Sequence, residues 1–135
     1  MKRGTIFFKF FVGLLILLFG CSTDTDDSTS PINVSTLPVI ESVACGHFHT
    51  IIIKNDGTLW ATGLNQDGQL GTGNTNGTKT FIQVLEDVKE VAASYHRTMV
   101  LMKDDSLWGT GLNDYGQLGT GDFNNNSLIF IKIFQ

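Results

Sequence analysis

A glycine-rich segment of eleven residues occurs twice in this chain of 135 residues, and its two copies start 48 positions apart. The first copy, Gly63–Gly73, reads GLNQDGQLGTG, and the second, Gly111–Gly121, reads GLNDYGQLGTG. A shift of 48 aligns Val43–Gly73 with Val91–Gly121 without a gap, and 16 of the 31 aligned positions are identical. A period of 20 to 50 residues indicates a repeat architecture, in which one unit recurs and neighbouring units bury each other's faces.

Each repeat unit has the sequence pattern of β-structure. The apolar run Thr50–Ile53, the residues Asn55-Asp56-Gly57 and the run Thr58–Ala61 predict a β-hairpin, because Asp-Gly supplies the positive φ angles of a tight turn. The second unit keeps both runs but has Asp105 at this turn, and Asp adopts such angles less easily than Gly. No segment after residue 20 has the periodicity of a helix longer than one turn. Four more strands are expected, at Ile40–Cys45, Phe81–Leu85, Val88–Ala93 and Leu128–Phe134.

The repeat resembles that of the regulator of chromosome condensation family, in which V-A-x-G-x-x-H-T precedes a strand and G-x-N-x-x-G-Q-L-G-x-G follows the hairpin. The second unit departs from this pattern at Ser94, Arg97 and Asp105, where the family has Gly, His and Gly. The resemblance implies a β-propeller with four short strands per blade, usually seven blades, and loops on its two faces that form the binding surface. The repeat-signature turn residues that it implies are Gly63, Asn65, Gly68, Gln69, Gly71, Gly73, Gly111, Asn113, Gly116, Gln117, Gly119 and Gly121.

The fold predicted for this chain is therefore all-β, with two four-stranded propeller blades at about 40–87 and 88–135, within a repeat region of residues 31–135. Two blades leave the ring incomplete, and repeat folds need about three units for stability. Three explanations stay open: a truncated or split gene, self-association of copies to close a ring, and a small open sheet. Truncation is favoured because the sequence stops where a family member would continue into its next V-A-x-G strand.

The first twenty residues have the pattern of a secretory signal peptide. Three basic residues precede a ten-residue apolar run, 10–19, which is shorter than the roughly 20 residues of a membrane-spanning helix. A retained membrane anchor is the alternative. The segment LFGC that ends at Cys21 resembles a bacterial lipobox and implies lipid attachment to this cysteine. The acidic residues 21–30 are expected to form a flexible tether, so the protein is expected to be lipid-anchored at the bacterial cell envelope, with the outer membrane or the cell surface as candidate destinations.

Charge and cysteine content restrict the partners further. Without residues 1–20 the chain keeps six basic and thirteen acidic residues, a net charge of −7, which argues against nucleic acid as a partner. Once Cys21 carries lipid, Cys45 has no second cysteine, so an intrachain disulfide is excluded. Cys45 lies in the apolar segment SVACG and is expected to be a small buried thiol.

No segment has the residues of a catalytic, cofactor or metal site. The glycine-rich segments lack the lysine and the following helix of a phosphate-binding loop. His47 and His49 would share one face of a strand, but the second unit does not repeat the pair, so His49 is expected to be a hydrogen-bonded structural residue. Asn65 and Asp67 lack the spacing of a calcium loop and are expected to be solvated. The two tryptophans occupy the same repeat position and are expected in the blade cores, at Trp60 and Trp108.

These observations predict a non-enzymatic, membrane-tethered protein of the cell envelope that binds a protein or another macromolecule through propeller loops. A regulatory propeller is the first alternative, either an enzyme inhibitor or a GTPase exchange factor. The export signal argues against the exchange factor, because its GTPase would be intracellular. A truncated gene product without independent function is the second alternative. No cofactor is expected, and self-association to complete a propeller stays open.

Overall fold

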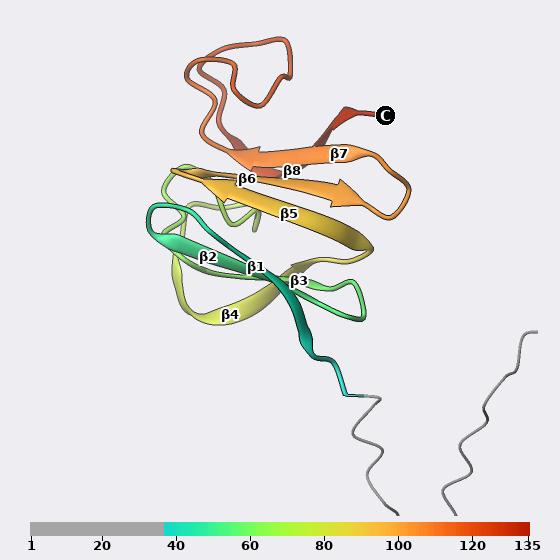
Figure 1. Ribbon diagram of the computed structural model, residues 1–135. Helices are drawn as coiled ribbons and strands as arrows, with labels where there is room; N and C mark the ends of the chain where they lie inside the picture. Colours follow the sequence, from blue (N-terminus) through green and yellow to red (C-terminus); the bar gives the residue numbers. More distant parts are fainter. Residues whose placement is uncertain (1–36) are drawn as a thin grey trace, which may run out of the picture. The chain divides into compact units, whose positions relative to one another are not determined.

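A computed structural model describes residues 37–135, so the predicted signal peptide (1–20), Cys21 and the tether (21–30) lie outside the described residues. Eight strands form two four-stranded antiparallel sheets, each in the order of the sequence. We call the first sheet blade 1 and the second blade 2 (Figure 1). Among residues 37–135 there is no helix, and hence none long and apolar enough to span a membrane. The strands are β1 (Ile40–Cys45), β2 (His49–Lys54), β3 (Leu59–Gly63), β4 (Thr78–Leu85), β5 (Val88–Ser94), β6 (Arg97–Met102), β7 (Leu107–Gly111) and β8 (Ser127–Phe134).

The β2–β3 and β6–β7 hairpins form where the sequence predicts them. Gly57 has a φ of 86°, and Asp105 at the equivalent position has a φ of 63°. An aspartate fixes each turn: Asp56 Oδ1 accepts hydrogen bonds from the backbone N–H of Thr58 at 2.9 Å and from its hydroxyl at 2.6 Å. The same two bonds join Asp104 to Ser106 in blade 2. Each hairpin is therefore determined by local Asp chemistry at fixed offsets.

The last strand of each blade shows where the two repeats differ in length. Gly63 pairs with Thr78 in blade 1, and Gly111 pairs with Ser127 in blade 2. The β7–β8 connection is therefore one residue longer than the β3–β4 connection. Equivalent residues are 48 apart through the glycine-rich segments and 49 apart in the last strand, so that Phe81 of blade 1 corresponds to Phe130 of blade 2.

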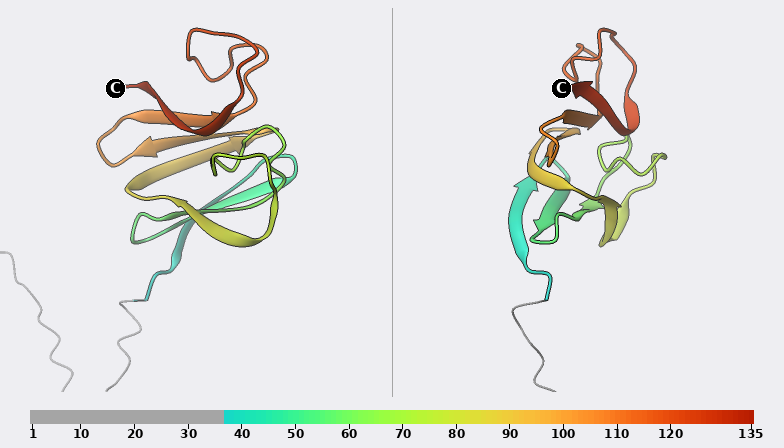
Figure 2. Two further views of the ribbon diagram at one scale, coloured as in Figure 1. Left: turned by 180° about the vertical axis from the view of Figure 1, so that it is seen from behind. Right: turned by 90° about the vertical axis from the view of Figure 1, so that its right-hand side faces the viewer.

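The two blades share one hydrophobic core. The strand β5 lies beside β1 and β2 (Figures 1 and 2). Ile51, Ile53 and Leu59 of blade 1 are fully buried and form one cluster with Val100 and Phe130 of blade 2. Burial of such side chains contributes about 1.5 to 3 kcal/mol each, so the contact between the blades is the main source of apolar stabilisation in this region.

Each blade has two faces, which we name after this contact. The forward face carries Ile51 in blade 1 and its equivalent Met99 in blade 2. The rear face carries Val100 in blade 2 and its equivalent Ile52 in blade 1. Within residues 37–135, the forward face of blade 1 packs on the rear face of blade 2, while the other two faces have no blade against them.

The rear face of blade 1 explains two wrong predictions. Cys45 is exposed and not a buried thiol, because it lies on this uncovered face, whereas its equivalent Ala93 in blade 2 packs against the shared core. Trp108 also packs against that core, as predicted. Trp60 does not, and it is instead half-buried with Lys54 Nζ 3.6 Å above its ring centroid.

Candidate functional site

The glycine-rich segments form two loops, which we call loop 1 (Asn65–Gly73) and loop 2 (Asn113–Gly121). An asparagine side chain holds each loop from inside. Asn65 Oδ1 accepts a hydrogen bond from the N–H of Leu70 at 2.8 Å, and its Nδ2 donates to Thr72 Oγ1 at 2.9 Å. The asparagine of loop 2 makes the same two bonds. Both asparagines are fully buried, so the prediction that Asn65 is solvated is wrong.

The backbone of both loops enters the left-handed region at equivalent glycines. Side chains with a Cβ adopt this region only at a cost, which glycine does not have. Both copies therefore need glycine for their own backbone conformation. The φ angles lie between 69° and 110° at Gly63, Gly68, Gly71, Gly73, Gly111, Gly116, Gly119 and Gly121.

Loop 1 lies in the junction between the blades. The carbonyl oxygen of Gly68 accepts a hydrogen bond from Thr110 Oγ1 at 2.8 Å. The carbonyl oxygen of Gln69 accepts one from Thr98 Oγ1 at 2.7 Å. Both threonines belong to blade 2 and are fully buried. Loop 1 therefore joins the two blades through buried hydrogen bonds as well as through apolar contact.

The glycines of loop 1 are also needed for space. A Cβ on Gly68 would lie 2.5 Å from the carbonyl oxygen of Ser127, and a Cβ on Gly71 would lie 2.4 Å from the ring of Phe130. Both obstacles belong to blade 2. At the equivalent positions of loop 2, the nearest atom to a Cβ lies 3.1 Å away for Gly116 and 3.5 Å away for Gly119, and both neighbours, Phe123 and Ile133, belong to blade 2 itself. The close approach of the two blades therefore adds a steric requirement to loop 1 that loop 2 does not have.

Loop 2 has no blade packed against it within residues 37–135. Gln69 is fully buried in the junction, whereas its equivalent Gln117 is only partly buried. Asp67 Oδ2 lies 2.6 Å from His96 Nδ1 across the junction, so the prediction that Asp67 is merely solvated is wrong. Its equivalent in loop 2 is Tyr115, whose side chain is 85% exposed.

His49 lies buried in the junction, with its Nε2 3.0 Å from Thr98 Oγ1. Because this hydroxyl donates to the carbonyl oxygen of Gln69, it accepts a hydrogen from His49 Nε2, which fixes the tautomer of the ring. Burial and, to a lesser extent, the neighbouring His96 lower the pKa of His49 to about 4. His49 is therefore neutral at pH 7, and the prediction of a hydrogen-bonded structural residue is confirmed.

Four aromatic side chains meet at the loops that join β1 to β2 and β5 to β6. His47 lies in the first loop and not on a strand, so the prediction that it shares a strand face with His49 is wrong. The His47 ring is 3.9 Å from the ring of Phe48 and 5.3 Å from that of Tyr95, which stacks at 4.3 Å on His96. The N–H of His47 donates to the carbonyl oxygen of Tyr95 at 2.9 Å. We call these four residues the aromatic cluster.

Tyr95 has an unusual backbone conformation, with a φ of 48°. Bulky residues rarely adopt this region, whereas Asp and Asn tolerate it. The ring of Tyr95 is nevertheless 55% exposed. The structure thus holds a large aromatic side chain at the surface at a conformational cost. The other non-glycine residues with positive φ are Asp87, Asp105 and Asn124.

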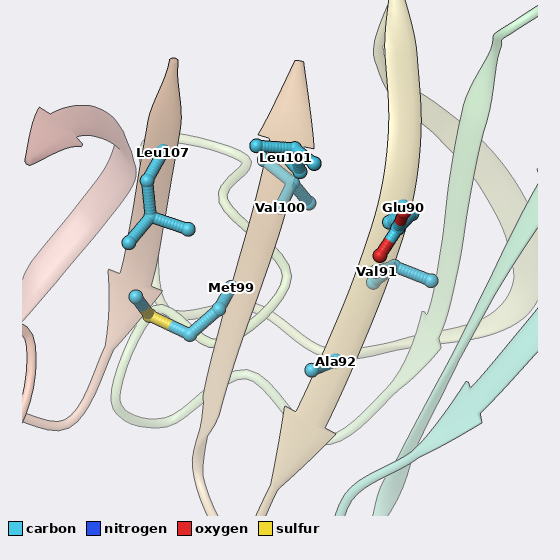
Figure 3. A pocket seen from close by; sticks show the side chains of 7 residues that line it. All are labelled: Glu90, Val91, Ala92, Met99, Val100, Leu101 and Leu107. Carbon is cyan, nitrogen blue, oxygen red and sulfur yellow. The ribbon is translucent and has the colours of Figure 1, made fainter. Parts of the chain in front are cut away.

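Within residues 37–135, no three His, Cys, Asp or Glu side chains converge to hold a metal ion. The forward face of blade 2 has a groove of about 170 Å³, lined by Met99, Leu101, Leu107 and Glu90 among others (Figure 3). Its other lining residues are apolar. One carboxylate without a second titratable group does not form an acid–base pair, so the groove has the chemistry of a packing surface.

Sequence reasoning missed the residues that hold the junction together. Thr98 and Thr110 have identical counterparts in the first repeat, Thr50 and Thr62, and this identity was the only signal of their role. The pair of Asp67 and His96 has no counterpart in the other repeat, so nothing in the sequence indicated it. Pairing across a junction depends on how the units pack, which a single repeat does not show.

The chain is similar to known proteins in both sequence and fold. One model of the Regulator of chromosome condensation (RCC1) repeat matches residues 40–69 and 88–117, and a second matches residues 56–101. The X-linked retinitis pigmentosa GTPase regulator homolog of Caenorhabditis elegans is 44% identical over 45 residues, which are 33% of this chain and 3% of that protein. The regulator of chromosome condensation of Mus musculus is 37% identical over 54 residues, 40% of this chain and 13% of that protein. The chain therefore spans a small part of the length of these relatives.

Two solved structures have the same fold. Yeast RCC1 (Prp20), in its complex with Kap60, has a TM-score of 0.67 at 20% identity, over 73% of this chain and 25% of that chain. Human WBSCR16 has a TM-score of 0.63 at 26% identity, over 69% of this chain and 25% of that chain. These similarities confirm the prediction of two four-stranded propeller blades, and the blades of residues 37–135 do not close a ring.

Proposed function

We propose that this chain is a non-enzymatic protein that binds a protein partner through the loops at the blade junction. The chain belongs to the regulator of chromosome condensation (RCC1) repeat family. The similar yeast protein is described as bound to Kap60 and by its binding properties to Gsp1p and histones. Those descriptions support protein recognition as the use of such blades. They do not identify the partner of this chain, which covers about a quarter of the yeast protein.

The observation that carries the proposal is the exposed ring of Tyr95. Tyrosine is enriched among the residues that dominate protein–protein binding energy. This ring is oriented before binding, because it stacks on His96 and because its own carbonyl oxygen is bonded to His47. A side chain that is already ordered loses less entropy on binding, typically saving about 0.5–1.5 kcal/mol.

The junction beneath the aromatic cluster fixes its position. His96 is tied to Asp67 of loop 1, and the neighbouring His49 is tied to Thr98. The loop that presents Tyr95 is thus held by contacts from both blades. Loops on a rigid scaffold are the usual place of binding residues, which supports a recognition surface here.

The proposal also includes a lipid anchor on Cys21, which rests on the signal-peptide pattern and the segment LFGC. Cys21→Ala should move the protein from the membrane fraction to the soluble fraction of bacterial cells. The matched control is Cys45→Ala, which removes the other cysteine and should leave the protein with the membranes. An unchanged distribution of the Cys21→Ala variant contradicts the anchor.

Binding through the aromatic cluster is tested in cells by photo-crosslinking of the full chain. Replacing Tyr95 with p-benzoylphenylalanine should give an adduct with a different protein after irradiation. The control places the same group at Phe134, an exposed aromatic residue on the outer strand of blade 2. If position 95 gives no such adduct, or if both positions give the same adducts in the same yield, Tyr95 is not a recognition residue.

A further inference from the structure

The forward face of blade 2 repeats a surface that the protein already uses. In blade 1 the forward face is buried by blade 2, whereas the equivalent residues of blade 2 line the groove of Figure 3 and are only partly buried. The residues stay apolar although nothing in residues 37–135 covers them. The equivalent pairs are Ile51 and Met99, Ile53 and Leu101, and Leu59 and Leu107.

The rear face of blade 1 is the matching half of the same interface. Val88 of blade 2 is 2% exposed, and its equivalent in blade 1, Ile40, is 63% exposed. Phe130 is 7% exposed, and its equivalent Phe81 is 41% exposed. Exposed apolar side chains grouped on one face of a sheet mark an interaction surface. The described region thus offers one half of its internal interface on each of its two outer faces.

The polar groups of the junction have equivalents on the two outer faces as well. The carbonyl oxygens of Gly68 and Gln69 accept hydrogen bonds from two threonines of blade 2. Loop 2 offers the equivalent carbonyl oxygens of Gly116 and Gln117. The rear face of blade 1 carries the equivalent hydroxyls, which are those of Thr50 and Thr62, and the Thr62 hydroxyl donates to the carbonyl oxygen of Thr78 at 3.1 Å, as that of Thr110 does to Ser127.

Where the two halves depart from the internal junction, they depart in a complementary way. The internal contact of Asp67 with His96 is replaced by two aromatic side chains, because Tyr115 is the equivalent of Asp67 and Phe48 is that of His96. Tyr115 is 85% exposed and Phe48 is 60% exposed. Two exposed aromatic rings at these positions can stack on each other when the faces meet.

A second departure is a pair of opposite charges. Glu90 lines the groove on the forward face of blade 2, where blade 1 has the uncharged Ser42. Lys54 lies over Trp60 on the rear face of blade 1, where blade 2 has the uncharged Met102. Both charges lie toward the end of their blades that carries the Asp turn, so docking of one face on the other brings opposite charges together.

We propose that a second copy of this chain docks on the first, with the forward face of blade 2 and loop 2 of one copy against the rear face of blade 1 in the other. In this contact Tyr115 of one copy stacks on Phe48 of the next, and Glu90 pairs with Lys54. The interface is head-to-tail, so it generates either a closed ring or an open filament.

The contact is tested in the full chain by replacing Tyr115 with p-benzoylphenylalanine and irradiating intact cells. The expected product has twice the mass of the chain, with the crosslink in the peptide that contains Phe48. The control has the same group at Lys132, an exposed residue that pairs with Trp108 of the rear face of blade 2 and so lies outside the contact, and it should give no product of this mass. Only monomer from position 115, or a crosslink to another part of the chain, overturns the proposal.

A charge exchange separates a lost contact from a lost fold. Lys54→Glu or Glu90→Lys alone should reduce the crosslinked product several-fold, because each variant places like charges together. The double variant should restore it, since the pair is then reversed. Failure of the double variant to recover, while its circular dichroism and melting temperature match the parent, overturns the pairing. Tyr95 is the equivalent of His47 and lies at the edge of this contact, but the two crosslinks read different products. Position 115 tests for a second copy of the chain and position 95 for a different protein, so a negative result for one leaves the other proposal standing.

Discussion

Loop 1 and loop 2 have nearly the same sequence and the same backbone conformation, but their surroundings differ. Loop 1 is packed against blade 2 and donates or accepts hydrogen bonds across the junction, whereas loop 2 has no blade against it within residues 37–135. The comparison separates two reasons for glycine in the repeat. One reason is the left-handed backbone, which both loops share, and the other is the space that a neighbouring blade takes, which only loop 1 experiences.

The largest expected difference is between Gly68→Ala and Gly116→Ala. Both variants place a Cβ at positive φ, which costs about 1–2 kcal/mol. At Gly68 the Cβ also meets the backbone of Ser127 and Leu128, which must shift, whereas at Gly116 it meets the ring of Phe123 at 3.1 Å. Overpacking against backbone adds about 1–3 kcal/mol. Urea unfolding should show that the free energy of unfolding falls by about 4 kcal/mol for Gly68→Ala and by less than half of that for Gly116→Ala. Equal losses would show that the neighbouring blade adds no steric requirement at Gly68.

The pH dependence of stability tests the buried His49. Its folded pKa of about 4 lies below the value of about 6.5 in the unfolded chain, so the unfolded chain takes up the proton first. The free energy of unfolding is therefore unaffected above pH 6.5 and falls as the pH drops toward 4, by about 3 kcal/mol at pH 4. Carboxylates titrate in the same range, so the control is His49→Gln. Between pH 6.5 and pH 4, its free energy of unfolding should fall by about 3 kcal/mol less than that of the parent protein. Parallel pH curves for the two proteins would contradict a buried neutral histidine.

Thr98→Val and Thr50→Val form a matched pair on the two rear faces. Thr98 is fully buried and bonded to both Gln69 and His49, so valine leaves two buried groups without partners. We expect a loss of about 2 kcal/mol in the free energy of unfolding. Thr50 faces no blade within residues 37–135, and its substitution should change stability by less than about 0.5 kcal/mol in dilute solution. A loss at position 50 as large as at position 98 would show that the two faces are not different.

The smallest expected effect is at the turn where the repeats differ, Gly57 in blade 1 and Asp105 in blade 2. Asp105→Gly removes a side chain from positive φ, which favours folding by roughly 1 kcal/mol. It also removes the ion pair with Lys89 at 2.8 Å, which is exposed and screened by solvent. Thermal unfolding should show a net gain below about 1 kcal/mol, and Lys89→Ala as the control should show a small loss. A clear destabilisation by Asp105→Gly would mean that the aspartate has another role.

The repeat and the hairpins could be predicted because their causes are local. The Asp turns, the alternation of the strands and the glycines of the two loops all act within one unit, so a single sequence contains them. The burial of Cys45 was predicted wrongly because it depends on whether another blade lies on that face. Asn65 was assigned to solvent because a polar residue in a loop usually faces water, but here it supplies the hydrogen bonds that the inside of the loop requires. Tyr95 was missed because it lies in the two-residue turn between Ser94 and Arg97, and nothing in the sequence indicates a bulky residue with positive φ there.

The central claim is that a neighbouring blade packs against loop 1 and holds it in place, whereas loop 2 has no such neighbour within residues 37–135. Amide hydrogen exchange measured by NMR in dilute solution tests it at two equivalent residues. The N–H of Gly73 donates to the carbonyl oxygen of Leu128 at 2.8 Å, whereas that of Gly121 has no backbone partner among residues 37–135. We predict strong protection at Gly73, exchange at nearly the intrinsic rate at Gly121, and protection of Gly121 only as the protein concentration rises. Equal protection of the two amides in dilute solution, or fast exchange at Gly73, would contradict the account.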